Sequence, residues 1–145
     1  MIKILLADDH ELVRAGIQAL LNACDDMSVV GVASSGEEVV EKVSNLLIDV
    51  VLMDIDMPGM GAAEACRQIL QANAEAKIIV VSVSNDSHIP PELFKLGVSG
   101  FISKDSPVDE IRSYALTAGE KSGFKYSFPQ LNSEINAARS WVINK

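Results

Sequence analysis

The sequence feature that most constrains the fold is an alternation of short apolar runs with longer segments of helical period. Five runs have the length and composition of buried strands, at residues 2–7, 29–33, 48–53, 77–83 and 100–103. Strands that alternate with helices form βαβ units, in which the strands run parallel and helices cover both faces of the sheet. We therefore predict an α/β fold, with a doubly wound five-stranded parallel sheet flanked by five helices.

The helices are expected where apolar residues recur three or four positions apart. The first is marked by Leu12, Val13, Ile17, Leu20 and Leu21, the second by Gly36, Val39, Val40, Val43 and Leu47, and the third by Ala62, Ala65, Cys66, Ile69 and Leu70. Proline suits a first helical turn and glycine suits a helix end. The fourth helix is accordingly expected between Pro90-Pro91 and Gly97, and the fifth from Pro107 towards Ala118.

The composition changes near Gly119. Residues 119–129 contain two glycines, a proline and several polar residues, as a linker does. Beyond them, a further helical stripe is formed by Leu131, Ile135, Ala138 and Val142. We therefore predict a domain at residues 1–118, followed by a linker and an extra C-terminal helix at residues 119–145 that packs against the domain or a second chain.

The 145-residue chain is acidic, with a formal net charge of −8 and a sequence pI of about 4.6. Nucleic-acid binding depends largely on Lys and Arg side chains, so we do not expect this chain alone to bind DNA specifically. No apolar run approaches the roughly 20 residues that cross a bilayer, and the N-terminus lacks the pattern of a secretory signal. Two cysteines, Cys24 and Cys66, do not make a disulfide framework. These features predict a cytoplasmic protein without membrane association.

Polar residues stand where the predicted strands end. Asp8 and Asp9 follow the first strand and Asp54 follows the third, while Ser82 and Lys104 stand at the ends of the fourth and fifth. In an open α/β sheet, ligands bind beyond the carboxyl ends of the strands. We therefore expect three carboxylates, a hydroxyl and an ammonium group to meet at one edge of the sheet.

This set of groups suits the transfer of a phosphoryl group to a carboxylate. Neighbouring carboxylates resist ionising together, and Mg²⁺ relieves the repulsion while keeping waters that a phosphate oxygen can replace. A carboxylate can attack phosphorus to give an aspartyl phosphate, on which Lys104 would place positive charge and Ser82 a hydrogen bond. Taken singly, each residue has an ordinary structural role, such as a turn or helix cap for aspartate. Their combination at the strand ends predicts a phosphate-accepting site.

Four segments extend this interpretation through a family resemblance. They are Leu6-Ala7-Asp8-Asp9-His10, Met53-Asp54-Ile55-Asp56-Met57-Pro58-Gly59-Met60, Val80-Val81-Ser82-Val83 and Gly100-Phe101-Ile102-Ser103-Lys104-Asp105. Over about residues 1–118, the sequence resembles the receiver domain of bacterial two-component response regulators. Within that family it resembles the LuxR/FixJ/NarL-type group, which carries a helix-turn-helix output domain. The resemblance implies a flavodoxin-like strand order of 2-1-3-4-5.

The resemblance also implies roles for the acidic residues. Asp54 matches the phosphoacceptor, which also contacts the metal. Asp8 and Asp9 match the pair that holds Mg²⁺, with Asp9 as the direct ligand, and Asp56 matches a position whose backbone carbonyl binds the metal. Magnesium is the cofactor that this match implies.

The remaining matches concern the switch and its partners. Ser82 matches the hydroxyl that moves onto the phosphate, Phe101 the aromatic that swings inward, and Lys104 the phosphate-binding lysine. A sensor histidine kinase is implied as phosphodonor. A homodimer is expected through the face of the fourth helix, fifth strand and fifth helix, or through the C-terminal helix. DNA contact is expected only through an output domain, of which residues 119–145 offer no more than a linker and one helix.

Two other functions fit part of the sequence. A phosphatase that forms an aspartyl phosphate uses a second carboxylate two residues after its nucleophile, and Asp56 stands at that spacing from Asp54. Such an enzyme also needs a substrate pocket or cap domain, which this short chain does not suggest, so we expect no enzymatic role. A phosphate-independent interaction module is the other alternative, and the presence of all five site residues argues against it.

Overall fold

The computed structural model describes residues 1–82, 91–103, 111–113 and 115. Within them the chain forms one five-stranded sheet of order β2-β1-β3-β4-β5, in which every neighbouring pair is parallel. This is the flavodoxin-like α/β arrangement that was predicted, with strand order 2-1-3-4-5. The predicted domain boundary at residues 118 and 119, the linker and the C-terminal helix lie outside the described residues.

The elements alternate along the chain as expected. The strands are β1 (Ile2–Ala7), β2 (Met27–Ala33), β3 (Val50–Asp54), β4 (Lys77–Ser82) and β5 (Gly100–Ser103). The helices are α1 (Glu11–Asn22), α2 (Gly36–Asn45), α3 (Ala62–Ala72) and α4 (Pro91–Leu96). Residues 111–113 and 115, which lie within the predicted fifth helix, have helical conformation.

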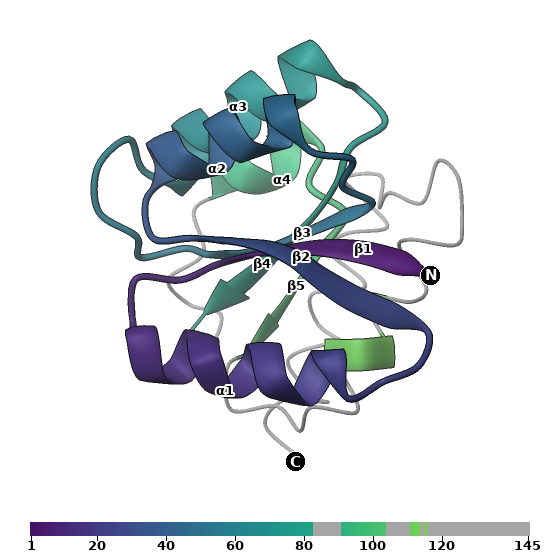
Figure 1. Ribbon diagram of the computed structural model, residues 1–145. Coiled ribbons are helices and arrows are strands. Elements are labelled where there is room, and N and C mark those ends of the chain that lie inside the picture. Colours follow the sequence, from purple (N-terminus) through teal and green to yellow (C-terminus); the bar gives the residue numbers. More distant parts are fainter. Residues whose placement is uncertain (83–90, 104–110, 114, 116–145) are drawn as a thin grey trace.

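Helices cover both faces of the sheet. In Figure 1, α2, α3 and α4 lie together on one face, and α1 lies on the other with the helical residues near 111. An ion pair joins this helical segment to the loop after α1, where Arg112 Nη2 lies 2.5 Å from Asp26 Oδ2. Three layers result, so both faces of each central strand are buried, as expected for a parallel sheet.

The core follows from the two-residue period of the strands, which turns successive side chains to opposite faces. One buried cluster, beneath α2, α3 and α4, includes Leu5, Val51, Met53, Ile78, Val80 and Phe101. The other, beneath α1, includes Ile4, Leu6, Leu52, Ile79, Val81 and Ile102. Continuous apolar strands are thus needed to fill both clusters.

Local signals fix the helix ends. Ser35 caps α2 by accepting a hydrogen bond from Glu38 N at 3.2 Å, and the Glu38 carboxylate accepts one from Ser34 Oγ at 2.5 Å. Such caps satisfy donors that the first helical turn leaves open. Gly97 follows α4 with φ of +100°, a left-handed conformation that glycine adopts at no steric cost. The predicted end of the fourth helix is confirmed.

The apolar stripe of the first helix is only partly buried. Leu21 is fully buried and Ile17 packs against the core, whereas Leu12, Val13 and Leu20 are exposed, Leu12 to 87%. Nine residues make two and a half helical turns. Leu12 and Leu21 therefore lie on opposite faces of α1 and cannot share one buried stripe.

Two further expectations need correction. Leu47 was expected within the second helix, on one face with Val39, Val40 and Val43, but α2 ends at Asn45 and Leu47 is 78% exposed. The chain becomes extended at Leu46, with φ of −124° and ψ of 153°, in order to lead into β3. The third strand starts at Val50, two residues later than expected, and ends on Asp54 itself. The second strand begins two residues early, at Met27.

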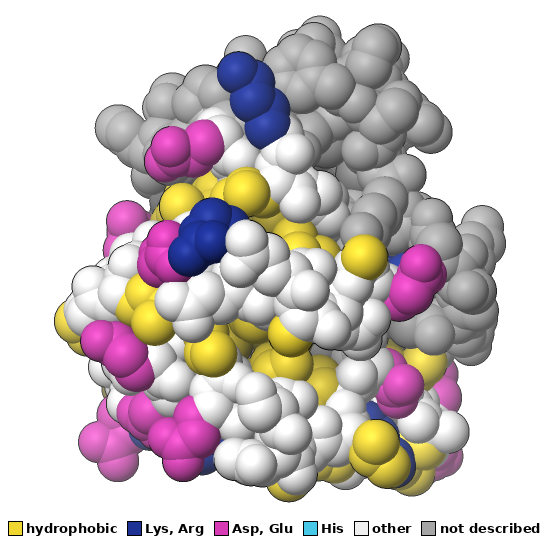
Figure 2. All heavy atoms as spheres, turned by 90° about the horizontal axis from the view of Figure 1, so that it is seen from above, with side chains coloured by type: hydrophobic (Ala, Val, Ile, Leu, Met, Phe, Trp, Pro, Cys, Tyr) yellow, Lys and Arg dark blue, Asp and Glu magenta, His cyan; other side chains and the backbone are white. Residues whose placement is uncertain are grey.

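The face formed by α2, α3 and α4 is shown in Figure 2. Acidic side chains are spread across it, a few basic ones stand among them, and hydrophobic side chains show between the helices. The basic side chains do not gather into a continuous patch among the residues coloured there. Of the helices in the described part of the chain, none is long and apolar enough to cross a bilayer.

Candidate functional site

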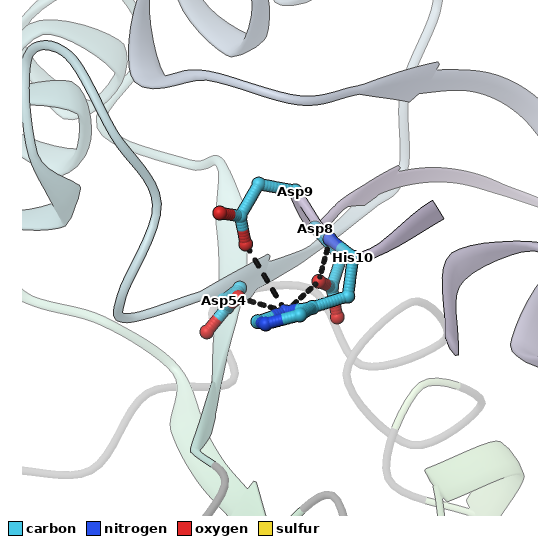
Figure 3. Close-up of side chains that lie close together, drawn as sticks. All are labelled: Asp8, Asp9, His10 and Asp54. Atoms are coloured by element: carbon cyan, nitrogen blue, oxygen red, sulfur yellow. Dashed lines mark hydrogen bonds and ion pairs between the residues drawn. The ribbon is translucent and has the colours of Figure 1, made fainter. Parts of the chain in front are cut away.

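The site lies where β1 and β3 end side by side. The two strands are paired from Ile4 with Val50 to Ala7 with Met53, so their next residues, Asp8 and Asp54, emerge at the same edge of the sheet. Asp54 is fully buried, and Asp8 is 2% exposed. The side chain of Asp9 is more open, at 32%. The predicted meeting of these three carboxylates is present in the structure (Figure 3).

Both buried carboxylates are oriented by turns of their own backbone. Asp8 Oδ1 accepts a hydrogen bond from His10 N at 2.8 Å, and Asp54 Oδ1 accepts one from Asp56 N at 3.0 Å. Each bond joins a side chain to the amide two residues on, which is the geometry of an Asx turn. These turns lead the chain away from β1 and β3 and leave the carboxylates at the strand ends.

The ring of His10 lies among the three carboxylates. Its Nδ1 lies 3.1 Å from Asp8 Oδ1, 3.1 Å from Asp9 Oδ1 and 3.9 Å from Asp54 Oδ2. Figure 3 shows the ring close to all three carboxylates, of which Asp8 and Asp9 come from the segment after β1 and Asp54 from the end of β3. An ionised carboxylate only accepts hydrogen bonds, so in the tautomer with a hydrogen on Nδ1 the ring donates to Asp8 Oδ1 at 3.1 Å.

The same four residues form a group with the spacing of a metal site. One ligand atom from each of Asp8, Asp9, His10 and Asp54 can be chosen so that all lie within 4.8 Å of one another. Three of these donors are carboxylate oxygens, which suit a hard divalent cation such as Mg²⁺. A cation there would offset the repulsion of charges that the fold buries together.

Two residues support the site from neighbouring elements. Arg14, on the first turns of α1, donates from Nη1 to the backbone carbonyl of Asp8 at 2.8 Å. Glu37, on α2, accepts a hydrogen bond from Met60 N at 2.9 Å and so ties the turn after β3 to α2. Gly59 lies in that turn with φ of +85°, and a Cβ there would collide with the Glu37 carboxylate. The hydrogen bond with Met60 lowers the pKa of Glu37.

The structure places the other predicted site residues to different extents. Asp56 lies in the turn after β3, exposed to solvent. Ser82 ends β4, one residue beyond the partner of Asp54 in the sheet register, and its side chain lies outside what the structure describes. Phe101, on β5, is 6% exposed and belongs to the core beneath α4. Lys104 lies outside the described residues.

Sequence reasoning assigned no role to His10, Arg14 or Glu37. His10 had a usable signal, because it directly follows the acidic pair. Arg14 and Glu37 had none, since Arg14 acts through a carbonyl six residues earlier and Glu37 through an amide 23 residues away. Only the folded chain shows these contacts.

Comparisons with known proteins agree with this geometry. The model of the response regulator receiver domain family matches residues 4–116, a span that contains both strand ends and all the predicted site residues. The match covers most of the chain and shows the family directly.

Curated relatives carry the same description. The response regulator GacA of Pseudomonas syringae is 38% identical over 136 residues, which are 93% of this chain and 62% of that protein. The response regulator UvrY of Escherichia coli is 43% identical over 113 residues, which are 78% of this chain and 52% of that protein. The chain thus spans little more than half the length of these relatives.

A solved structure extends the likeness to three dimensions. The LuxR-family two-component response regulator of Aurantimonas sp. SI85-9A1 superposes with a TM-score of 0.79 at 29% identity, over 94% of this chain and 96% of that one. The fold, the acidic strand ends and these matches lead to one conclusion. The chain belongs to the response regulator receiver family of two-component signalling, in its LuxR/NarL-type branch.

Proposed function

We propose that this receiver accepts a phosphoryl group on Asp54 and uses it as a reversible switch. The observation that carries the proposal is the placement of Asp54. Its carboxylate is fully buried at the end of a central strand, yet it stands with Asp8 and Asp9 around one point, the Nδ1 of His10. A fold that retains buried neighbouring charges accepts a cost in stability, which is typical of functional sites.

The proposed reaction is a simple displacement at phosphorus. A carboxylate oxygen of Asp54 forms the new O–P bond, and the bond from phosphorus to the donor breaks, with its electron pair leaving on the donor. With a phosphohistidine donor, the leaving group is the imidazole of the kinase. Asp54 then carries an acyl phosphate, which water later hydrolyses to restore the carboxylate.

Magnesium is the proposed cofactor, held by Asp9 and Asp54 directly, by the backbone carbonyl of Asp56, and by Asp8 through its contribution to the acidic site. When bound, it would neutralise charge on the phosphoryl oxygens and orient them. The Asx turn at Asp54 supports the assignment of Asp56, because it holds that residue beside the acceptor. Lys104 and Ser82 remain predicted phosphate contacts from the neighbouring strands.

The proposed switch runs from Asp54 towards α4 and β5. Asp54 follows Met53, which shares a buried cluster with Met57 after the strand, Leu93 on α4 and Phe101 on β5. Packed interiors transmit displacements because they contain few voids. A phosphate on Asp54, with Ser82 drawn towards it, would shift the balance between two packings of Phe101.

The partners follow from this role. We propose a sensor histidine kinase as the phosphodonor and a cytoplasmic setting, as expected for this family. We further propose that the switch controls transcription through an output domain outside this sequence, and that the face of α4 and β5 mediates self-association. The acidic charge of the chain supports leaving DNA contact to another domain.

Acetyl phosphate provides a direct test without the kinase. With Mg²⁺, intact-mass measurement should show one added phosphoryl group on the chain, stable in acid and labile in base. Asp54→Asn should remain unlabelled. Asp49→Asn, which changes an aspartate just before the same strand, is the matched control and should be labelled like the parent. Equal labelling of Asp54→Asn and the parent would refute the assignment.

The competing enzymatic role makes a separate prediction. A phosphatase would release phosphate from an added phosphomonoester through many turnovers. A receiver would show no sustained turnover of such a compound. Steady release of inorganic phosphate by the parent, absent from Asp54→Asn, would favour the enzyme.

A further inference from the structure

We propose that His10 selects the cation that enters the acidic site. Its ring stands between the carboxylates, where Mg²⁺ must displace it and where an imidazole-binding ion such as Ni²⁺ would retain it as a ligand. This inference rests on the proposed function, because it assumes that Asp8, Asp9 and Asp54 form the metal site. It gives His10, which lies within reach of that site, a role in the choice of ion.

The geometry of the ring carries the first step. Nδ1 is at hydrogen-bonding distance from Asp8 and Asp9, at 3.1 Å from an oxygen of each, and it lies 3.9 Å from Asp54. A cation that bound all three carboxylates would lie among the same oxygens (Figure 3). The ring N–H and the cation therefore compete for one position.

The position of His10 in the chain provides a second, independent observation. His10 is the N-cap of α1, where a side chain commonly accepts a hydrogen bond from the first turn. Its side chain makes no such bond, and its ring contacts the carboxylates instead. The ring is therefore directed into the site by contacts with the carboxylates, not by a need to cap the helix.

The exposure of His10 allows it to move. Its side chain is 56% exposed, so rotation into solvent would unpack none of the buried core. The backbone bond from His10 N to Asp8 Oδ1, at 2.8 Å, does not depend on the ring. The ring can thus leave while the turn that orients Asp8 persists.

The ligand preference of the ion then decides whether the His10 ring is displaced or retained as a ligand. Mg²⁺ prefers oxygen ligands and keeps several of its waters, so it gains little from an imidazole and loses the space that the ring fills. Ni²⁺ binds imidazole well, and His10 would add a nitrogen to the carboxylate oxygens. Removal of the ring should therefore change the two affinities in opposite directions.

The test is calorimetric titration of Mg²⁺ and Ni²⁺ into the metal-free full chain at one fixed pH. For His10→Ala, we expect Mg²⁺ to bind about three- to tenfold more tightly, the range set by a lost hydrogen-bond competitor. Ni²⁺ should bind more weakly, because it loses an imidazole ligand that suits it. His10→Asn, which introduces a side chain that favours the N-cap position, should shift both affinities in the same directions and controls for any loss of α1 in the alanine variant.

Leu12→Ala is the matched control, because Leu12 lies two residues after His10, in the first turn of α1, and is 87% exposed; it should leave both affinities unchanged. If both ions bind more weakly to the His10 variants, or if neither affinity changes, the selectivity role is wrong. Failure of the proposed function would look different. In that case Mg²⁺ would bind neither the parent nor His10→Ala, and the metal site and this inference would fall together.

Discussion

Aspartates stand at both ends of this sheet, and their surroundings differ. At the amino end, Asp49 Oδ2 accepts a hydrogen bond from Lys3 N at 2.7 Å, while Asp49 N donates to Lys3 O at 2.8 Å. Asp26 Oδ2 meets the guanidinium of Arg112 at 2.5 Å. At the carboxyl end, Asp8, Asp9 and Asp54 gather around one histidine ring.

Burial sharpens the contrast. Asp49 is exposed and the Asp26 side chain is 37% exposed. Each of them also has a donor, Lys3 N for Asp49 and the Arg112 guanidinium for Asp26. Asp8 and Asp54 are buried, at 2% and 0% exposure, close to other acidic groups. Burial of neighbouring like charges costs stability. The amino-end aspartates thus join segments of the fold, whereas we propose that those at the carboxyl end serve metal binding and phosphoryl transfer.

Removal of the metal should produce the largest difference between the two ends. We expect excess chelator, or Asp9→Ala, to reduce phosphoryl incorporation from acetyl phosphate below detection, because the phosphate charge would then face unshielded carboxylates. Asp49→Ala should retain full incorporation. Intact mass measures the incorporation, and far-ultraviolet circular dichroism checks that each variant is folded. Undiminished labelling in chelator would show that the carboxyl-end cluster needs no metal.

The second-largest effect is expected on stability, when the charge of Asp54, the proposed phosphoacceptor, is removed. We expect Asp54→Asn to raise the free energy of unfolding of the metal-free protein by about 1–2 kcal/mol, because a buried charge beside other carboxylates is removed. An asparagine oxygen can still accept the hydrogen bond from Asp56 N, so the turn is kept. Urea unfolding in chelator measures the change.

The same titration in saturating Mg²⁺ is the control for this prediction. A metal that binds the native parent stabilises it by mass action, so the advantage of Asp54→Asn should shrink or reverse. A loss of stability in chelator would mean that the charge of Asp54 is well compensated within the metal-free fold, and the contrast between the two ends would then be weaker than proposed.

Removal of the Asp49 side chain, at the amino end of the sheet, should lower the free energy of unfolding, and by less than Asp54→Asn raises it. Asp49→Ala removes the side-chain acceptor for Lys3 N but keeps the backbone bond to Lys3 O. We expect a loss of about 1 kcal/mol in the free energy of unfolding, typical of one hydrogen bond, and no dependence on Mg²⁺. A Mg²⁺-dependent loss would connect this end of the sheet with the metal site.

The sequence allowed the layered fold to be predicted because its physical cause is local. A strand buried on both faces must be largely apolar, and β1, β3 and β4 are apolar except for a few polar residues, Lys3 in β1, Asp54 at the end of β3, and Lys77 and Ser82 at the ends of β4. The site could be predicted for a related reason, since the carboxyl ends of parallel strands share one edge. Asp8 and Asp54 are confirmed as neighbours at that edge, while their chemical roles remain predictions.

What could not be predicted depends on side-chain direction and on distant contacts. Helical period alone predicted α1 but does not show which of its apolar residues meet the sheet, and Leu12 and Leu20 are in fact exposed. The ring of His10 could equally have capped α1 or pointed into solvent. The bond between Glu37 and Met60 depends on how α2 and the turn after β3 pack, and no spacing in the sequence encodes that.

Glu37 shares features with the aspartates at both ends of the sheet. Its substitution is expected to have the smallest effect, a modest loss of Mg²⁺ affinity. It stands near the carboxyl ends of the strands, yet its carboxylate accepts a backbone hydrogen bond from Met60, as Asp49 accepts one from Lys3. Through Met60 it ties down the turn that contains Asp56, whose carbonyl we propose as a metal ligand. Glu37 is therefore expected to be a positioning residue that acts on the metal through this turn.

Glu37→Ala should weaken Mg²⁺ binding roughly two- to fivefold, as expected for one lost hydrogen bond, while Glu37→Gln, which keeps an acceptor oxygen, should restore it. Because the hydrogen bond with Met60 lowers the pKa of Glu37 below its ordinary 4.5, its stabilising contribution is present above pH 4.5 and is lost as the pH falls through the lowered value. Near neutral pH, the parent should thus show no change in Mg²⁺ affinity that originates from Glu37. If Glu37→Ala and Glu37→Gln weakened Mg²⁺ binding equally, the effect would come from the charge of Glu37. Glu37 would then act on the metal as the carboxyl-end aspartates are proposed to do.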